Sequence, residues 1–234
     1  MKKYVIQKSE MGLVFKNEVL RRIVTKVKTY RFLQAEMLII NKKDYLPLKE
    51  MTVAELESLK ENDLSVDYLI PTGFQGILYV DGVFKEMLES GRHWFITVDK
   101  KVEVKTIDVR KRTIHVNAQE ILTTDKIDLR VNFAVSFNVV DAKKALTEYD
   151  KFDDALYLLC QLVIREYISS KTMDEILEEK ASLGEKLLAI LRPKEKEYGI
   201  AFIDAGLKDV ILPGDIKAIL NTVLVAQKQA QANV

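Results

Sequence analysis

The stretch "KIDLRVNFAVSFNVV", residues 126–140, carries the clearest structural pattern of the sequence. Apolar side chains fill every second position from Ile127 to Val139, and polar or small side chains lie between them. Such alternation is typical of a long β-strand with one face in the core and the other face wet or paired. The preceding "TTDK", residues 123–126, predicts a turn from an earlier strand near residues 114–118.

The residues after this strand predict helices with a single strand among them. The stretch 151–170 is apolar almost all round in its middle, which indicates a buried helix. A Thr-Glu capping box at 172–175 starts a second helix, which we expect to run to Pro193. Residues 200–212 then predict a strand with a bulge near Gly206.

The beginning of the chain echoes a later segment. "YVIQKSEMGLVFKNEVL", residues 4–20, aligns without a gap with "YLIPTGFQGILYVDGVF", residues 68–84, at an offset of 64. The identical pairs include Tyr4 with Tyr68, Ile6 with Ile70, Gly12 with Gly76 and Val19 with Val83. Each copy has two apolar runs around a short polar turn, which predicts a β-hairpin. An internal repeat predicts that residues 4–32 superpose on 68–96, whereas convergent hairpin composition is the alternative.

Two further elements are expected between these copies. A short strand is predicted around residues 38–40, closed by a turn that contains Pro47. Thr52 and Glu55 form a capping box, which opens a short helix within residues 51–67. We therefore expect this stretch to connect the two copies.

The composition is that of a globular protein. Hydrophobic residues make up 48% of the 234 residues, which is ample for a packed core. Lys and Arg number 36 against 35 Asp and Glu, so we expect no nucleic-acid partner. The single cysteine, Cys160, excludes an internal disulfide and fits a reducing compartment. No apolar run approaches the roughly 20 residues of a spanning helix, so we expect a soluble or peripherally attached chain on the cytoplasmic side.

Two stretches point to a known family when their order along the chain is considered. They are "IDVRKR…AQEILTTDKIDLRVNFAVSFNVVD", residues 107–141, and "YGI…DVILP", residues 198–213. Over residues 68–234 the chain resembles the stomatin, prohibitin and flotillin superfamily (SPFH or band 7 domain), and within it the slipins, the bacterial stomatin-like proteins. The resemblance implies an α+β fold with helices packed on a mostly antiparallel sheet. We then expect a β-rich module at 1–50, a connector at 51–67, the SPFH domain at 68–212 and the start of a coiled coil at 213–234.

The resemblance also implies a function, that of a non-enzymatic oligomeric scaffold. Members hold an α+β domain at a membrane, continue into a long coiled coil, and assemble into rings or cages that enclose membrane proteins or membrane-bound proteases. The implied partners are further copies of the chain, through the SPFH domain and the coiled coil, and a membrane-anchored protease of the NfeD type or another membrane protein. The implied location is peripheral, at the cytoplasmic face of the membrane. A peripheral lipid-binding module that forms no cage is the alternative.

This sequence departs from the family pattern at both ends. The usual hydrophobic N-terminal anchor is missing, residues 1–67 are additional, and the coiled coil stops after its first turns. We therefore expect the 234 residues to be part of a longer protein.

Basic and aromatic residues are the candidate contacts to a membrane surface. Each cation near an anionic surface contributes about 1 kcal/mol. One cluster holds Arg21, Arg22, Lys26 and Lys28, and the other holds Arg110, Lys111 and Arg112. Phe74 and Trp94 are candidate aromatic anchors at the lipid interface. The alternatives are a solvated strand face for the cations and core packing for the aromatic rings.

The last helix is a candidate oligomer contact. After Pro213 apolar residues recur at helical spacing, and the Ala- and Gln-rich end at 226–234 adds helix propensity with almost no apolar face. The predicted stripe consists of Ile216, Ile219, Leu220, Val223 and Leu224.

Catalytic motifs are absent from the sequence. It contains no G-x-S-x-G, H-E-x-x-H, P-loop or G-x-G-x-x-G pattern, and we expect no catalytic residue, metal or cofactor. A soluble hydrolase stays the weaker alternative because it would have to use His93 or His115. We expect the first to be a turn or packing histidine and the second to lie at a strand surface or edge. Cys160 is expected to behave as a small buried hydrophobe.

Overall fold

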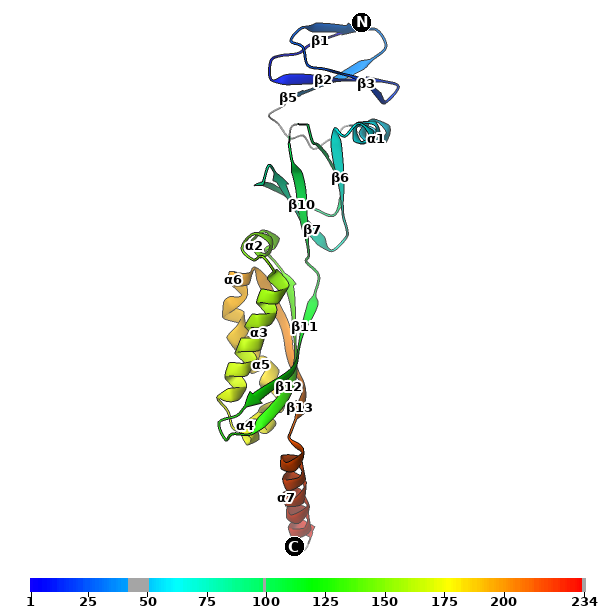
Figure 1. Cartoon of the computed structure of the whole chain (residues 1–234). Helices are drawn as coiled ribbons and strands as arrows, with labels where there is room; N and C mark the ends of the chain where they lie inside the picture. Colours follow the sequence, from blue (N-terminus) through cyan, green and yellow to red (C-terminus); the bar gives the residue numbers. More distant parts are fainter. Residues whose placement is uncertain (42–50, 99, 233–234) are drawn as a thin grey trace. The chain divides into compact units, whose positions relative to one another are not determined.

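A computed structural model describes residues 1–41, 51–98 and 100–232 of the chain (Figure 1). The chain divides into two compact units, Met1–Asp108 and Val109–Val234. The strand pairs of the described residues are antiparallel, and helices accompany them in both units. The predicted α+β fold with mostly antiparallel sheets is therefore confirmed. The predicted turn at Pro47 lies outside the described residues.

The first unit opens with five strands, which we call the first module. They are β1 (Lys2–Val5), β2 (Glu10–Lys16), β3 (Val19–Val24), β4 (Thr29–Phe32) and β5 (Glu36–Asn41). β2 and β3 form a hairpin, because Asn17 and Glu18 take φ of 52° and 62°, the left-handed conformation of a two-residue turn. β5 pairs with the other side of β2, while β1 and β4 pair with each other as a separate two-stranded sheet.

Helix α1 (Val53–Glu61) covers one face of the first module. It begins at the predicted capping box, where the Thr52 hydroxyl accepts a hydrogen bond from the Glu55 backbone amide. Its Leu56 and Leu59 join the apolar side chains of one β2 face in a buried cluster. The members contributed by the first module are Met11, Leu13, Phe15 and Ile40.

The second module repeats the strand order of the first. Its strands are β6 (Ser65–Ile70), β7 (Phe74–Val80), β8 (Val83–Leu88), β9 (Gly91–Ile96) and β10 (Val102–Asp108). Here β7 lies between β10 and β8, as β2 lies between β5 and β3 in the first module. Likewise β6 pairs with β9, as β1 pairs with β4.

The two central hairpins also agree in register. The bounds of β7 and β8 follow those of β2 and β3 by 64 residues, Gly12 lies opposite Val24, and Gly76 lies opposite Leu88. In each hairpin, counting from the glycine pair, the register shifts after the third residue pair. The pairing of β1 with β4 differs by one residue in register from the corresponding pairing of β6 with β9. The internal repeat itself stays a prediction.

The second unit is built on a three-stranded sheet in the order β11-β12-β13. The strands are β11 (Arg112–Leu122), β12 (Asp128–Val139) and β13 (Ile200–Ile211). Along central β12 each second residue from Leu129 to Val139 is buried, as the sequence alternation predicts. The bulge predicted near Gly206 is confirmed, although Gly206 itself lies in register opposite Ala134. The two register shifts fall on either side of it, at Ile203 and Lys208.

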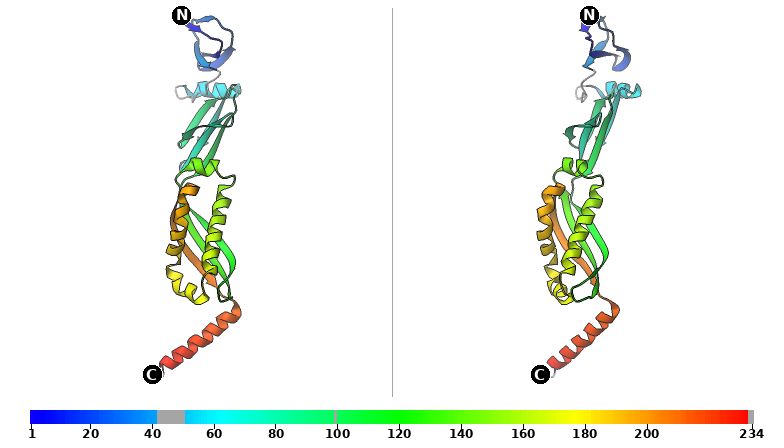
Figure 2. Two further views of the ribbon diagram at one scale, coloured as in Figure 1. Left: turned by 90° about the vertical axis from the view of Figure 1, so that its left-hand side faces the viewer. Right: turned by 60° about the vertical axis from the view of Figure 1, so that its left-hand side comes forward.

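Helices cover one face of this sheet (Figures 1 and 2). The helices between β12 and β13 are α2 (Ala142–Thr147), α3 (Phe152–Ser169), α4 (Met173–Glu178), α5 (Leu183–Leu191) and α6 (Glu195–Tyr198). A last helix, α7 (Gly214–Ala232), follows β13. The capping box at Thr172 starts α4 as predicted. The expected single helix up to Pro193 is wrong, since a 3-10 turn over Glu179–Ala181 separates α4 from α5.

The prediction that α3 is buried all round is also wrong. Leu156, Cys160 and Ile164 face the core, whereas Leu158 and Leu162 on the other side are 51% and 54% exposed. The physical reason is that α3 belongs to a single helical layer, so the sheet covers only one of its sides.

Candidate functional site

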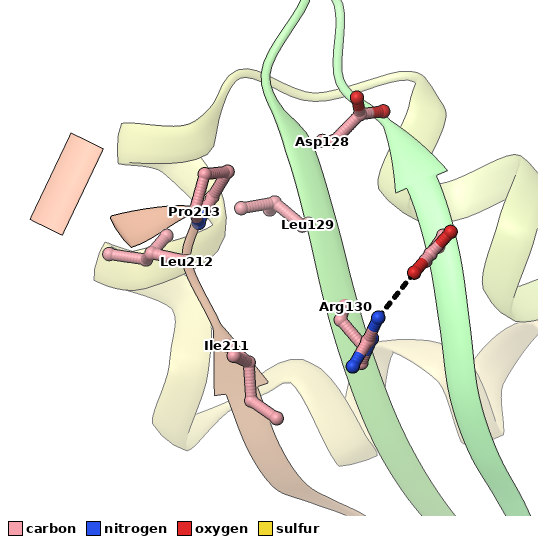
Figure 3. A pocket seen from close by; sticks show the side chains of 7 residues that line it. Asp128, Leu129, Arg130, Ile211, Leu212 and Pro213 are labelled. Carbon is pink, nitrogen blue, oxygen red and sulfur yellow. Dashed lines mark hydrogen bonds and ion pairs between the residues drawn. The ribbon is translucent and has the colours of Figure 1, made fainter. Parts of the chain in front are cut away.

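The end of the sheet where α7 begins carries a hollow of about 410 Å³ (Figure 3). Its lining comes from β11, β12 and the segment that joins β13 to α7, and comprises Glu120, Asp128, Leu129, Arg130, Ile211, Leu212 and Pro213. Arg130 donates a hydrogen bond to the Glu120 carboxylate on the neighbouring strand. The guanidinium is therefore already paired, and the hollow offers neither an imidazole nor a thiol.

The described residues do not assemble a metal site, and the two histidines and the cysteine have different surroundings. Among them, no group of three His, Cys, Asp or Glu side chains could hold a metal ion. His93 Nε2 lies 2.8 Å from the Glu89 carbonyl oxygen, and its ring stacks on Phe95. His115 is exposed on β11, an edge strand of the second unit's sheet. Burial raises the pKa of the Cys160 thiol to about 12, so this thiol is a poor nucleophile.

The most strongly perturbed carboxylate is structural. Glu179 Oε1 lies 2.8 Å from Lys186 Nζ, and Tyr167 donates a hydrogen bond of 2.6 Å to Glu179 Oε2. The hydrogen bond from Lys186, followed by the one from Tyr167, lowers the pKa of Glu179 to about 2. Burial, followed by the Glu179 contact, raises the pKa of Tyr167 to about 12. This network ties the 3-10 turn to α3 and α5 at the point where the helix breaks.

The first module exposes one predicted basic cluster. Arg21 and Arg22 lie on β3, and Lys26 and Lys28 lie in the loop that leads to β4. All four side chains are exposed, and the loop also carries Val27, which is 63% exposed. An apolar side chain between two lysines suits a surface that is both anionic and apolar.

The second predicted basic cluster is divided by the structure. Arg110 and Lys111 are exposed before β11 begins. Arg112 is different, because its guanidinium lies 5.0 Å from the centre of the Phe137 ring and its Nη1 lies 3.1 Å from Asp153. Held in this way, the Arg112 cation positions α3 against β11. The three consecutive basic residues in the sequence do not indicate this role.

The two candidate aromatic anchors are half-buried. Phe74 packs against the core of the second module, and Trp94 packs against the cluster under α1. The Lys60 ammonium lies 5.7 Å from the centre of the Trp94 ring. These contacts favour the core-packing alternative, and contact of either ring with lipid stays a prediction.

The predicted stripe on α7 is largely exposed. Ile219 and Val223 are 60% and 47% exposed, and Ile216 and Leu220 are half-buried. The Leu224 side chain lies outside the description. Sequence reasoning missed a second exposed apolar surface, Leu158 and Leu162 of α3. Their spacing of four residues was visible, but which side of the helix the sheet covers was not.

In the parts that the structure describes, no helix is long and apolar enough to cross a membrane.

These features define an α+β domain, preceded by β-rich modules and followed by a helix, with apolar and basic groups exposed on its surface. The chain matches the family described as "SPFH domain / Band 7 family" over residues 68–234. It therefore belongs to the SPFH (band 7) family, and the predicted superfamily is confirmed.

Several known sequences are similar to the chain. A stomatin homolog of Pyrococcus horikoshii is 28% identical over 144 residues, which cover 62% of this chain and 53% of the relative. Stomatin of Mus musculus is 26% identical over 128 residues, 55% of this chain and 45% of the relative. A putative band 7 family protein of Acanthamoeba polyphaga mimivirus is 23% identical over 165 residues, 70% of this chain and 54% of the relative. The matched region thus spans about half the length of each relative.

Proposed function

We propose that this chain is part of an oligomeric scaffold of the slipin type. It acts without catalysis at the cytoplasmic face of a membrane, where its copies organise membrane proteins or a membrane-anchored protease of the NfeD type. The observation that carries the proposal is the exposed stripe on α7. Apolar residues three and four apart are typical of helix association when they lie on a helix that no other described element covers extensively. Membership in the SPFH family and the similarity to stomatins support it.

Light scattering after size-exclusion chromatography tests the assembly. We expect residues 1–234 to form oligomers and residues 1–212, which lack α7, to lose most of that tendency. Ile219→Asp with Val223→Asp should act like the truncation, because both charges fall within the stripe. Asn221→Asp with Thr222→Asp is the matched control on the same helix and should leave the mass unchanged. A monomeric full chain contradicts the scaffold proposal.

Vesicle flotation tests the membrane contact. We expect the chain to float with anionic vesicles and not with zwitterionic ones, because the four cations of the first module carry the contact. Their joint replacement by Gln should abolish flotation. The matched control replaces four exposed lysines of the second unit that lie outside α7, Lys151, Lys180, Lys196 and Lys208. A chain that floats as a monomer identifies the lipid-binding module without cage formation.

A further inference from the structure

The two-stranded ribbon of β1 and β4 in the first module has a covered face and an exposed face. Tyr4 and Tyr30 lie opposite each other on the covered face. Tyr30 belongs to a buried apolar cluster, and Tyr4 packs against the same cluster. Successive side chains of a strand point to opposite faces, so the neighbouring residue pairs point away from it. All four side chains of these pairs are exposed, and the pairs are Lys3 with Arg31 and Val5 with Thr29.

An exposed apolar side chain lies at each end of β4. Val27 precedes the strand and is 63% exposed, and Leu33 follows the strand and is 81% exposed. A lysine adjoins the first of them on each side in the sequence. Beside the second, the Arg22 guanidinium lies 6.0 Å from the centre of the Phe32 ring. Cations and apolar groups thus share one surface without an acid, called the ribbon face below, which consists of Lys3, Val5, Val27, Thr29, Arg31 and Leu33.

The second module bears a different charge at the corresponding place. Asp67, which follows Lys3 by 64 residues, lies on β6 opposite Trp94. Its carboxylate pairs with Lys60 and lies 3.6 Å from the Arg92 guanidinium. On the ribbon face a lysine takes the place of this acid and lies opposite an arginine. Like charges directly opposite each other repel, so the ribbon face favours an anionic partner.

The whole first module shares this basic character. Residues 1–41 contain nine Lys and Arg against three Asp and Glu, whereas residues 65–108 contain five against seven. Since the strand order is the same in both modules, the fold does not require this difference in charge. A basic surplus on one module attracts it to an anionic surface.

We propose that the ribbon face lies on a lipid bilayer that contains anionic lipids. Val27 and Leu33 enter the interface between the lipid head groups, and Lys3 with Arg31 binds lipid phosphate groups. The two apolar ends are six residue steps apart, at most about 22 Å, so one flat surface touches both. The inference rests on the proposed function, because it names the side chains through which the scaffold meets its membrane.

A bilayer suits this face better than a protein partner does. The exposed apolar side chains are separate and lie at the two ends of a ribbon, whereas protein interfaces bury a closely packed apolar centre. A lipid interface accepts separate apolar groups and surrounds them with phosphates, which long basic side chains can reach. Single apolar groups among cations are therefore typical of contact with an anionic membrane surface.

Vesicle flotation of variants tests the ribbon face. Vesicles of phosphatidylcholine alone are compared with vesicles that also contain phosphatidylserine. Val27→Ser with Leu33→Ser should bind the anionic vesicles at least about tenfold more weakly than the wild type, because two apolar side chains no longer leave water. The matched control is Leu69→Ser with Val83→Ser in the second module, at positions that are 65% and 58% exposed. It should bind like the wild type, and thermal unfolding of both variants should match that of the wild type because all four positions are exposed.

The cations of the ribbon face are tested separately. Lys3→Gln with Arg31→Gln should weaken binding to the anionic vesicles about tenfold at low ionic strength, and much less at high ionic strength, where exposed charges are screened. Equal binding of the wild type to soluble poly-glutamate, which is anionic but has no apolar interior, would identify an acidic protein as the partner and overturn the lipid contact.

The outcomes separate the ribbon face from the proposed function. Wild-type binding by the Val27→Ser, Leu33→Ser variant, or an equal loss in its control, overturns the ribbon face and leaves membrane attachment standing. A wild type that floats with neither kind of vesicle overturns both the ribbon face and the membrane contact of the proposed function.

A polarity-sensitive fluorophore tests insertion directly. Attached to a Leu33→Cys chain, it should shift its emission to the blue when anionic vesicles are added, because its surroundings become less polar. The same fluorophore on a Leu69→Cys chain should not shift. Labelling is confined to the introduced thiol because Cys160 is buried. An unshifted label at residue 33 on a chain that floats refutes the ribbon face.

Discussion

Replacement of Gly184 by Ala should unfold the second unit more readily, because α5 touches β13 at this residue. A Cβ atom at Gly184 would lie 2.0 Å from the Ala205 carbonyl oxygen and 2.9 Å from the carbon of the same group. Normal contacts between such atoms are about 3.5 Å, so helix and strand must separate by more than about 1 Å. The obstacle is a strand backbone, which cannot rotate away as a side chain can.

The size of the effect follows from two opposed terms. Overpacking of this kind costs about 1–3 kcal/mol and sometimes more, and here the rigid neighbour places it at the upper end. The better helix propensity of Ala returns about 1 kcal/mol or less near a helix start. We therefore expect a net loss of about 2 kcal/mol in the free energy of unfolding, or a fall in Tm of roughly 5–10 °C for a unit of this size.

The assay must report on the second unit. Circular dichroism at 222 nm does so, because most of the helices lie there. The single tryptophan, Trp94, lies in the first unit, and its fluorescence gives an independent transition. Gly206→Ala is the matched control, since a Cβ there meets no atom within 4 Å. That variant should unfold within about 0.5 kcal/mol of the wild type. An unchanged or higher midpoint for Gly184→Ala would refute the close packing of α5 on β13.

Three further predictions concern single groups. The pKa of Glu179 in the folded chain lies near 2, below its ordinary value of 4.5, so the stability it confers is present above pH 4.5 and is lost as the pH falls toward 2. Glu179→Gln should flatten that part of the stability profile in urea titrations, and an unchanged acid slope would show that Lys186 does not stabilise the carboxylate. Gly76→Ala should cost only about 1 kcal/mol, because the new Cβ lies 2.4 Å from Ile70 Cδ1, the far end of a side chain that can turn away, and chemical denaturation followed by Trp94 fluorescence measures it. Cys160 should react with an aromatic disulfide reagent at pH 8 only after denaturant is added, since burial raises the pKa of this thiol to about 12, and fast labelling of the native chain would refute its burial.

The elements that local rules decide could be predicted from the sequence. The alternation from Leu129 to Val139 identified the central strand because side-chain burial on a strand has a period of two. The capping boxes at Thr52 and Thr172 placed two helix starts, since their hydrogen bonds join residues only three apart.

The features that depend on distant neighbours could not be predicted. Residues 110–112 are three similar cations in the sequence, and only the approach of Phe137 and Asp153 makes Arg112 a packing residue. The break after α4 likewise coincides with contacts from other helices, since Lys186 and Tyr167 hold Glu179 there. A continuous apolar spacing therefore predicted one helix where the structure has two.

The two uncovered surfaces of the second unit differ in a way that bears on assembly. The face of β12 away from the helices carries small or polar side chains such as Asn132, Ala134 and Ser136, so water covers it at little cost. On the outer side of α3, Leu158 and Leu162 gain free energy only when a partner covers them. Burial of a whole leucine side chain contributes about 1.5–3 kcal/mol, so two half-exposed leucines contribute about 1.5–3 kcal/mol together.

A contribution of that size does not hold an isolated pair of copies together, since association itself costs at least about 4 kcal/mol in translational and rotational freedom. The exposed leucines of α3 and the exposed stripe of α7 are two different surfaces, so a copy in the proposed scaffold uses them toward different neighbours. Contacts of this kind continue from copy to copy and become strong only when several form at once, as in a closed ring. Weak single contacts in a repeated series predict an assembly that appears steeply with concentration, and a gradual monomer–dimer equilibrium in sedimentation data would argue against it.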